Sequence, residues 1–139
     1  MALDIETRDQ LIETVNRFVS ERLRPLEAQV SETDAMPDDV IEEMKGLGLF
    51  GLSIPEEYGG LDLTMEEECL VAMELGRTSP AFRSAFGTNV GIGSQALVMF
   101  GNDEQKAKYL PGIASGGPAS RCEHGAAVGC AASAGIAYK

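Results

Sequence analysis

The sequence predicts an all-α protein, a five-helix bundle up to residue 116 followed by an irregular tail rich in Gly and Ala. Three observations support this prediction. Apolar residues recur at helical intervals along five stretches, capping and breaking residues bound each stretch, and no stretch makes a convincing strand. From residue 117 the composition changes abruptly, which predicts a segment 117–139 that buries little and has no fixed structure.

The helix starts are predicted from residues that satisfy the free N–H groups of a first turn, or that lack such a group. Thr7 with Gln10, and Thr64 with Glu67, have the spacing of a capping box. The three glutamates 66–68 are expected to form a solvated first turn. The five expected starts, in chain order, are Thr7, Pro37, Thr64, Ser79-Pro80 and Asn102.

The helix ends are predicted from Gly and Pro. The expected ends are Pro25, Gly46 to Gly48, Gly76, Gly101 and Pro111. The fourth helix, 79–101, has one broad apolar face and is expected to be the central, most buried one. Its glycines at 87, 91 and 93 each cost roughly 1 kcal/mol relative to Ala, so we expect another helix or a ligand to approach them closely.

The connection from Gly46 to Leu63, between the second and third helices, is the stretch around which the chain is organised. An apolar run precedes Pro55, and Gly59-Gly60 allow backbone angles that other residues resist. The sequence therefore predicts a buried turn here.

Composition limits the function classes. A chain of 139 residues supports about one domain core, and its net charge of −11 opposes binding to polyanions, so no nucleic-acid partner is expected. Three cysteines do not predict a disulfide framework, and no export signal is recognisable. The uncharged stretch 125–138 is too short to span a bilayer. We therefore expect a cytoplasmic protein without a membrane partner.

Two segments give the chain a family resemblance. Residues 46–63 contain a glycine-leucine helix end followed by Pro-Glu-Glu-Tyr-Gly-Gly, and residues 101–111 contain Gly-Asn-Asp-Glu-Gln-Lys and then Tyr-Leu-Pro. In order and spacing they resemble the N-terminal helical domain of acyl-CoA dehydrogenases. The likeness extends from Leu3 to Gly116.

The resemblance implies a reaction and a cofactor. Members of this family desaturate an acyl-CoA: a carboxylate removes the α-proton, and the β-hydrogen leaves as hydride to the flavin of FAD. A later β-domain holds most of the flavin, a later helical domain supplies the carboxylate, and nothing after Gly116 is long enough for either. We therefore expect a truncated chain that contains no catalytic or cofactor-binding residue and does not bind FAD alone.

The start of the tail differs from the family pattern. Family members follow the Leu-Pro segment with Thr-Glu-Pro-x-Ala-Gly-Ser-Asp, a motif that faces the flavin. Here the segment 122–126, Cys-Glu-His-Gly-Ala, resembles this motif at most weakly and lacks its threonine hydroxyl and its proline. A frameshift, a gene-end error or genuine decay would each produce such a tail.

One site carries over from the resemblance. Counting back from the matched Gly101, Ala85, Thr88 and Ile92 fall where family members line the acyl-tail pocket. Their i, i+3, i+7 spacing puts them on one helix face. The alternative is that they are ordinary core residues, because periodicity alone does not separate the two roles.

Other candidate sites are weaker. Residues 91–96 match a GxGxxA dinucleotide fingerprint, but a helix rather than a strand is expected before them. Cys122, His124 and Cys130 lack a fourth ligand, so no metal site is expected. His124 is the only histidine and no GxSxG elbow exists, which argues against nucleophilic catalysis.

Three function hypotheses follow. The first is the N-terminal domain of an FAD-dependent acyl-CoA dehydrogenase, which takes an acyl-CoA substrate in the intact enzyme. The second is an inactive helical binding module that forms a homo-oligomer or associates with a full-length dehydrogenase through its apolar faces. The third is a fragment of a flavoprotein similar to the acyl-CoA oxidases, which the residues before Gly116 do not separate from the first.

Overall fold

The computed structural model describes residues 3–117, apart from the side chains of Thr88, Asn89 and Ile92. Within that range it contains seven α-helices, two π-helical segments and two short 3-10 helices, and no strand. The predicted all-α fold is therefore confirmed. Except for Gly117, the expected irregular tail 117–139 lies outside the described residues.

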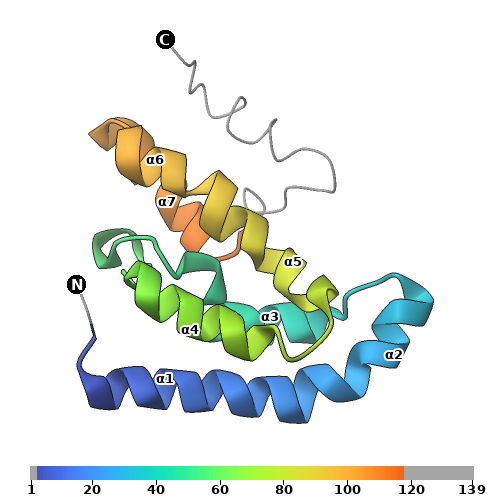
Figure 1. The fold of residues 1–139 in the computed structure, drawn as a ribbon. Helices are drawn as coiled ribbons and strands as arrows, with labels where there is room; N and C mark the ends of the chain where they lie inside the picture. Colours follow the sequence, from blue (N-terminus) through green and yellow to red (C-terminus); the bar gives the residue numbers. More distant parts are fainter. Residues whose placement is uncertain (1–2, 118–139) are drawn as a thin grey trace.

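The first helical rod runs from α1 through a π-helical segment into α2, and Figure 1 shows it bending there. Its parts are α1 (Ile5–Phe18), η1 (Val19–Leu23) and α2 (Arg24–Thr33). The predicted end at Pro25 is wrong. Pro25 lies in the first turn of α2, where the π-helical segment has already interrupted the regular ladder, so a missing N–H is tolerated.

The predicted capping box of Thr7 and Gln10 is also wrong, because Asp4 caps this helix. The Asp4 carboxylate accepts the Thr7 N–H at 2.9 Å and the Thr7 hydroxyl at 2.6 Å. The Thr7 hydroxyl, followed by the backbone N–H, lowers the pKa of Asp4. A charged carboxylate is favoured at a helix N-terminus, where it also complements the dipole.

The next two helices agree closely with the sequence. In α3 (Asp38–Gly46), Pro37 is the N-cap rather than the first helical residue, and the helix ends at the predicted glycine. In α4 (Met65–Leu75), the predicted capping box of Thr64 and Glu67 is present, and Gly76 is the C-cap. Local capping chemistry therefore predicted both boundaries of α4.

The predicted helix 79–101 is a second interrupted rod, made of α5 (Pro80–Thr88), η4 (Asn89–Gly93) and α6 (Gln95–Phe100). Its apolar face is not buried throughout, since Met99 is 66% exposed and Phe100 is 79% exposed. A π turn holds more residues than an α turn, so the face drifts around the rod beyond η4. The side chains that are buried along the rod are Phe82, Phe86, Val90, Ser94 and Leu97.

Of the two approaches expected at the glycines of this rod, that of another helix is absent at the two glycines that can be checked. A Cβ on Gly87 would meet only the side chain of Arg83, at 3.5 Å, and a Cβ on Gly91 would have no described atom within 4 Å. Neither glycine is explained by a neighbouring helix. Gly91 instead belongs to the π-helical segment.

The last helix, α7 (Asp103–Ala114), begins with a reciprocal capping box between Asn102 and Gln105. The predicted end at Pro111 is wrong, because the helix continues for another three residues. Ile113 and Ala114 are buried in a cluster with residues of α6 and the connection between α3 and α4. Burial of these side chains outweighs the hydrogen bond that Pro111 cannot make.

The connection between α3 and α4 is a buried turn, as predicted. Its first half contains η2 (Leu49–Gly51), its second half follows η3 (Glu56–Tyr58), and the side chains from Leu49 to Ile54 are buried. Three N–H groups of the second half donate to carbonyls of the first half: Leu61 to Gly51 at 2.9 Å, Asp62 to Ile54 at 2.9 Å and Leu63 to Leu52 at 2.8 Å. We call residues 49–63 the buried turn.

The buried turn joins two hydrophobic clusters. Phe50 and Leu52 belong to the larger cluster, to which α1 to α5 and both π-helical segments contribute. Ile54 belongs to the smaller cluster, together with Leu97 of α6 and Leu110 of α7. The buried turn therefore fixes the α6–α7 end of the molecule relative to the other helices, which lie below it in Figure 1.

Two glycines make the buried turn possible for different reasons. Gly59 has a positive φ of 85°, as predicted for a left-handed position. Gly60 is required by space instead, because a Cβ there would overlap the Ile54 carbonyl group. The second half of the turn can thus lie directly against the first.

We expect Gly60→Ala to lower the free energy of unfolding by about 2 kcal/mol or more, since backbone must move to admit the methyl group. The control is Gly46→Ala, because a Cβ there meets no atom within 4 Å and Ala favours the helix. Denaturant unfolding of both variants measures the difference. Equal stability of the two variants would show that the close approach at residue 60 is not needed.

Glu67 corrects the expectation of a solvated start for α4. Its side chain is 4% exposed, whereas Glu66 is exposed. The carboxylate accepts the N–H of Leu3 at 2.6 Å, and both the N–H and the hydroxyl of Thr64 at 2.7 Å. These bonds, led by that of the Thr64 hydroxyl, lower the pKa of Glu67. One carboxylate thus caps α4 and ties the N-terminal segment to it.

Glu67→Gln is expected to destabilise the fold by about 1–3 kcal/mol near neutral pH, because three donors lose a charged acceptor. Since the folded-state pKa is lowered, this stabilisation is complete above the ordinary value of 4.5 and is lost as pH falls through the folded-state pKa. The deficit, measured by denaturant unfolding, should therefore shrink in acid. Exposed Glu66→Gln is the control, and a Glu67→Gln deficit that is independent of pH would contradict the assignment.

Candidate functional site

The residues predicted to line an acyl pocket lie on the second interrupted rod. Ala85 and Thr88 are in α5, one α-helical turn apart, and Ile92 is in η4. Ala85 is half-buried and packs against the larger cluster. The side chains of Thr88 and Ile92 lie outside the description, so a common pocket wall stays a prediction. The π turn between positions 88 and 92 was not foreseen, and it changes the register on which the predicted face depends.

A carboxylate from a distant helix fixes the start of α5. Glu27 of α2 accepts the Thr78 hydroxyl at 2.7 Å and the Ser79 N–H at 3.1 Å. The Ser79 N–H, immediately before the first turn of α5, therefore has a charged acceptor that is not a neighbour in sequence. The partners of Glu27 lie 51 and 52 positions away in the sequence, so no local pattern indicates this contact.

The buried turn holds the middle of the same rod. The Ser53 hydroxyl donates to the Val90 carbonyl at 3.3 Å, and the Ser94 hydroxyl donates to the same oxygen at 2.8 Å. Nearby, the rings of Phe50 and Phe86 meet edge to face, with centroids 6.2 Å apart. Hydrogen bonding and aromatic packing together set the distance between η4 and the buried turn.

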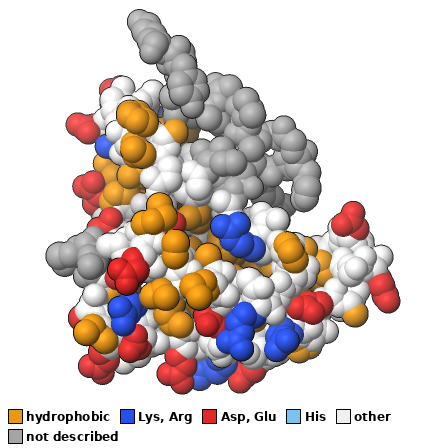
Figure 2. Space-filling model, in the orientation of Figure 1, with side chains coloured by type: hydrophobic (Ala, Val, Ile, Leu, Met, Phe, Trp, Pro, Cys, Tyr) orange, Lys and Arg blue, Asp and Glu red, His pale blue; other side chains and the backbone are white. Residues whose placement is uncertain are grey.

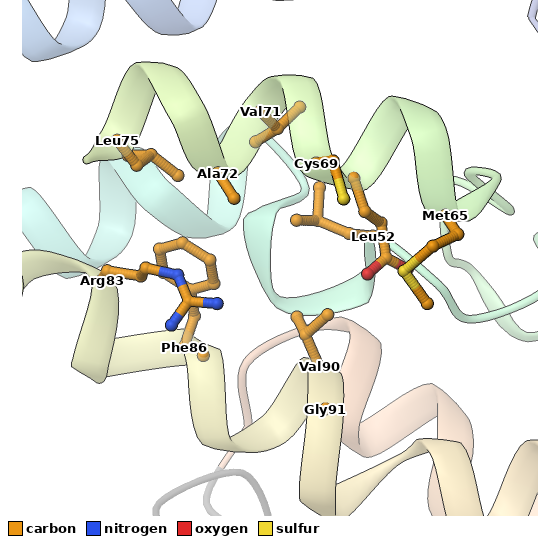
Figure 3. A pocket seen from close by; sticks show the side chains of 12 residues that line it. Leu52, Met65, Cys69, Val71, Ala72, Leu75, Arg83, Phe86, Val90 and Gly91 are labelled. Carbon is orange, nitrogen blue, oxygen red and sulfur yellow. The ribbon is translucent and has the colours of Figure 1, made fainter. Parts of the chain in front are cut away.

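A cavity of about 170 Å³ lies between α4 and the α5–η4 part of the rod. Figure 3 shows Met65, Cys69 and Ala72 on one side of it, with Phe86 and Val90 on the other. Its walls are mainly apolar. The charged residues that line it are Glu68 and Arg83.

Glu68 is the titratable wall residue with a shifted pKa. Burial raises the pKa of Glu68, and a hydrogen bond with the Ser53 side chain opposes the shift. Ser53 therefore has two acceptors within reach, the Glu68 carboxylate and the Val90 carbonyl, and its single hydroxyl proton is donated to one of them at a time. The arrangement is a polar link from the cavity wall to the π-helical segment.

The described residues offer little redox or metal chemistry. Cys69 is an exposed free thiol, and within residues 3–117 no group of three or more His, Cys, Asp or Glu side chains is placed to hold a metal. Cys122, His124 and Cys130 lie outside that range. The GxGxxA match at 91–96 lies in η4 and α6, as expected of a helix and not of a phosphate-binding strand-turn-helix.

Within the described residues, large apolar side chains are exposed on three helices, α1, α4 and α6. Figure 2 shows hydrophobic atoms gathered over α4 and at the outer end of α6. No helix in the described part of the chain is both long enough and apolar enough to cross a membrane. The exposed large hydrophobic residues are Ile5, Met65, Met73, Met99 and Phe100.

Comparison with known proteins assigns this fold. Residues 5–117 match the family model of the acyl-CoA dehydrogenase N-terminal domain. The chain belongs to this family. The match includes the buried turn, both interrupted rods and α7, so the family domain accounts for nearly all of the described structure.

Relatives of this acyl-CoA dehydrogenase N-terminal domain are longer proteins. The chain is 32% identical over 112 residues to an acyl-CoA dehydrogenase of Bacillus subtilis, covering 79% of this chain and 30% of that protein. It is 34% identical over 113 residues to the mitochondrial isovaleryl-CoA dehydrogenase of Solanum tuberosum, covering 80% and 27%. The chain thus spans less than a third of the length of these relatives.

A solved structure supports the same assignment. The crystal structure of acyl-CoA dehydrogenase from Bacillus anthracis, complexed with FAD, matches with a TM-score of 0.67 and 34% sequence identity. The match covers 80% of this chain and 19% of that one. The acyl-CoA dehydrogenase N-terminal fold is therefore shared at the level of both sequence and backbone.

Sequence reasoning missed the residues that position the candidate face. Glu27, Ser53 and Ser94 are ordinary polar residues in sequence, and their partners become apparent only in the fold. Ser94 alone gave a local hint, because a Ser within a helix can donate to the carbonyl four residues before it.

Proposed function

We propose that this chain serves as the N-terminal helical domain of an FAD-dependent dehydrogenase that desaturates acyl-CoA thioesters. The observation that carries this proposal is the family match over residues 5–117. Similar proteins are named acyl-CoA and isovaleryl-CoA dehydrogenases, and one solved relative is complexed with FAD. Within that function, we assign to this chain one wall of the pocket for the acyl tail, formed by Ala85, Thr88 and Ile92.

The net charge of the chain indicates which part of an acyl-CoA it would hold. Its net charge of −11 opposes the phosphates of coenzyme A, so the acyl tail is the part that suits the described residues. These residues do not fit FAD by themselves, because their glycine-rich match lies within helical segments and forms no phosphate-binding turn.

A second candidate function is association with another chain, either a second copy or a longer relative. Met99 and Phe100 at the end of α6 favour it, because both side chains are mostly exposed. Exposed apolar patches commonly mark interaction surfaces. This candidate needs no acyl binding, so the two are separable by experiment.

The acyl-wall proposal is tested by titrating the ¹⁵N-labelled chain with butyryl-, octanoyl- and dodecanoyl-CoA and following amide chemical shifts. We expect shift changes at residues 85–92 that grow with tail length, and none with coenzyme A alone. Ala85→Phe should reduce the response to the two longer tails about tenfold and spare butyryl-CoA, because the ring fills the wall. Ala81→Phe, at an exposed position of the same helix, is the matched control.

Two outcomes count against this function. Equal responses of the Ala85→Phe and Ala81→Phe variants to dodecanoyl-CoA would remove Ala85 from the pocket wall. Concentration-dependent line broadening at residues 99 and 100, with no acyl response anywhere, would favour association instead.

A further inference from the structure

The π-helical segment η4 lies inside the face that we assign to the acyl tail. Positions 85 and 88 precede it in α5, and position 92 lies within it. Short π-helical segments inside α-helices are uncommon and frequently occur at functional sites. The contacts that hold η4 in its π conformation therefore affect the shape of the proposed acyl wall.

Two hydroxyl groups converge on one carbonyl of η4. Ser94, which is fully buried, donates to the Val90 oxygen at 2.8 Å, and Ser53, which is 8% exposed, donates to it at 3.3 Å. Val90 itself is 8% exposed. A buried hydroxyl without a partner costs about 1–3 kcal/mol, so Ser94 favours the backbone conformation that presents this oxygen to it. Ser53 favours the same conformation when its proton is donated to Val90 and not to Glu68.

The second hydroxyl distinguishes η4 from regular helix. Thr14, Thr33 and Ser84 each donate to the carbonyl four residues earlier, at 2.8 to 3.0 Å, and the residues between donor and acceptor are regular α-helix in each case. A Ser or Thr bond of this kind is therefore not enough to produce a π turn. At Val90 the additional donor, Ser53, comes from the buried turn 37 residues earlier.

The conformation of η4 determines where position 92 lies. Successive residues of an α-helix are rotated by roughly 100° about the helix axis. A π turn contains about one residue more than an α turn, so a change of η4 from π-helix to α-helix would rotate the positions at its end by about that angle. Gly91 has open space around its Cα, so no side chain at that position resists such a change. The hydroxyl pair restrains η4 in addition to the burial of Val90 in the larger cluster.

We propose that Ser53 and Ser94 are positioning residues that hold η4 in its π conformation and thereby set the length of acyl tail that the wall accepts. This inference rests on the proposed acyl-wall function. The two hydroxyls donate to a backbone carbonyl, so they act by orienting position 92 relative to Ala85.

The conformational part is tested with Ser53→Ala, Ser94→Ala and the double variant, each as the full chain. We expect amide hydrogen exchange at residues 89–94 to accelerate about tenfold in the double variant, and the ¹³C shift of the Val90 carbonyl to move. Ser84→Ala, which removes the same kind of bond from an exposed part of α5, is the control and should leave both signals unchanged.

The fold of each variant is checked separately. If Ser94→Ala fails to fold, the same measurements are made on Ser53→Ala alone and on Ser94→Thr, which retains a hydroxyl. Unchanged exchange and an unchanged Val90 signal in the folded variant lacking Ser53 would overturn the inference.

The specificity part uses the same acyl-CoA titrations. The double variant should change the ratio of dodecanoyl-CoA to butyryl-CoA affinity at least fivefold, and Ser84→Ala should not. A wild-type chain without an acyl response would defeat the proposed function even where the exchange data show the restraint. If the wild-type chain responds to acyl-CoA and the double variant shows the same dependence on tail length, this inference is wrong and the proposed function stands.

Discussion

The hydrogen bonds between the two halves of the buried turn are the constraint on which the other packing depends. A connection of this length normally runs over a surface, because its polar backbone groups need partners. Here Leu61, Asp62 and Leu63 donate back to carbonyls between Gly51 and Ile54. The segment can therefore lie in the interior, with Phe50 in one hydrophobic cluster and Ile54 in the other.

The candidate site inherits its geometry from that turn. Ser53 reaches the Val90 carbonyl, and Phe50 packs against Phe86, so the middle of the α5–η4–α6 rod is fixed by residues of the buried turn. Glu27 fixes the start of the rod from the opposite side. The position of the face that carries Ala85 is therefore set by residues distant from it in sequence.

Local chemistry made much of the fold predictable. The capping box of Thr64 and Glu67 was identified because the two side chains are three residues apart, and Asn102 was identified because asparagine is a preferred N-cap residue. Tertiary packing caused the errors. Pro111 does not end α7, because the residues beyond it are buried, and Glu67 is not solvated, because Leu3 donates to it from 64 residues away. The same limit applies to the site: helical spacing suggested Ala85, Thr88 and Ile92, whereas a π turn that spacing does not reveal lies within their span.

Because both hydrophobic clusters depend on the buried turn, we expect it to open only when the whole domain unfolds. Native-state hydrogen exchange at the amides of Leu61, Asp62 and Leu63 tests it most directly, with the free energy of opening compared against the global free energy of unfolding from denaturant titration. The account predicts that the two energies agree and that both fall together in a destabilised variant. Exchange at these three amides through a local opening, at an energy well below the global value, would contradict it.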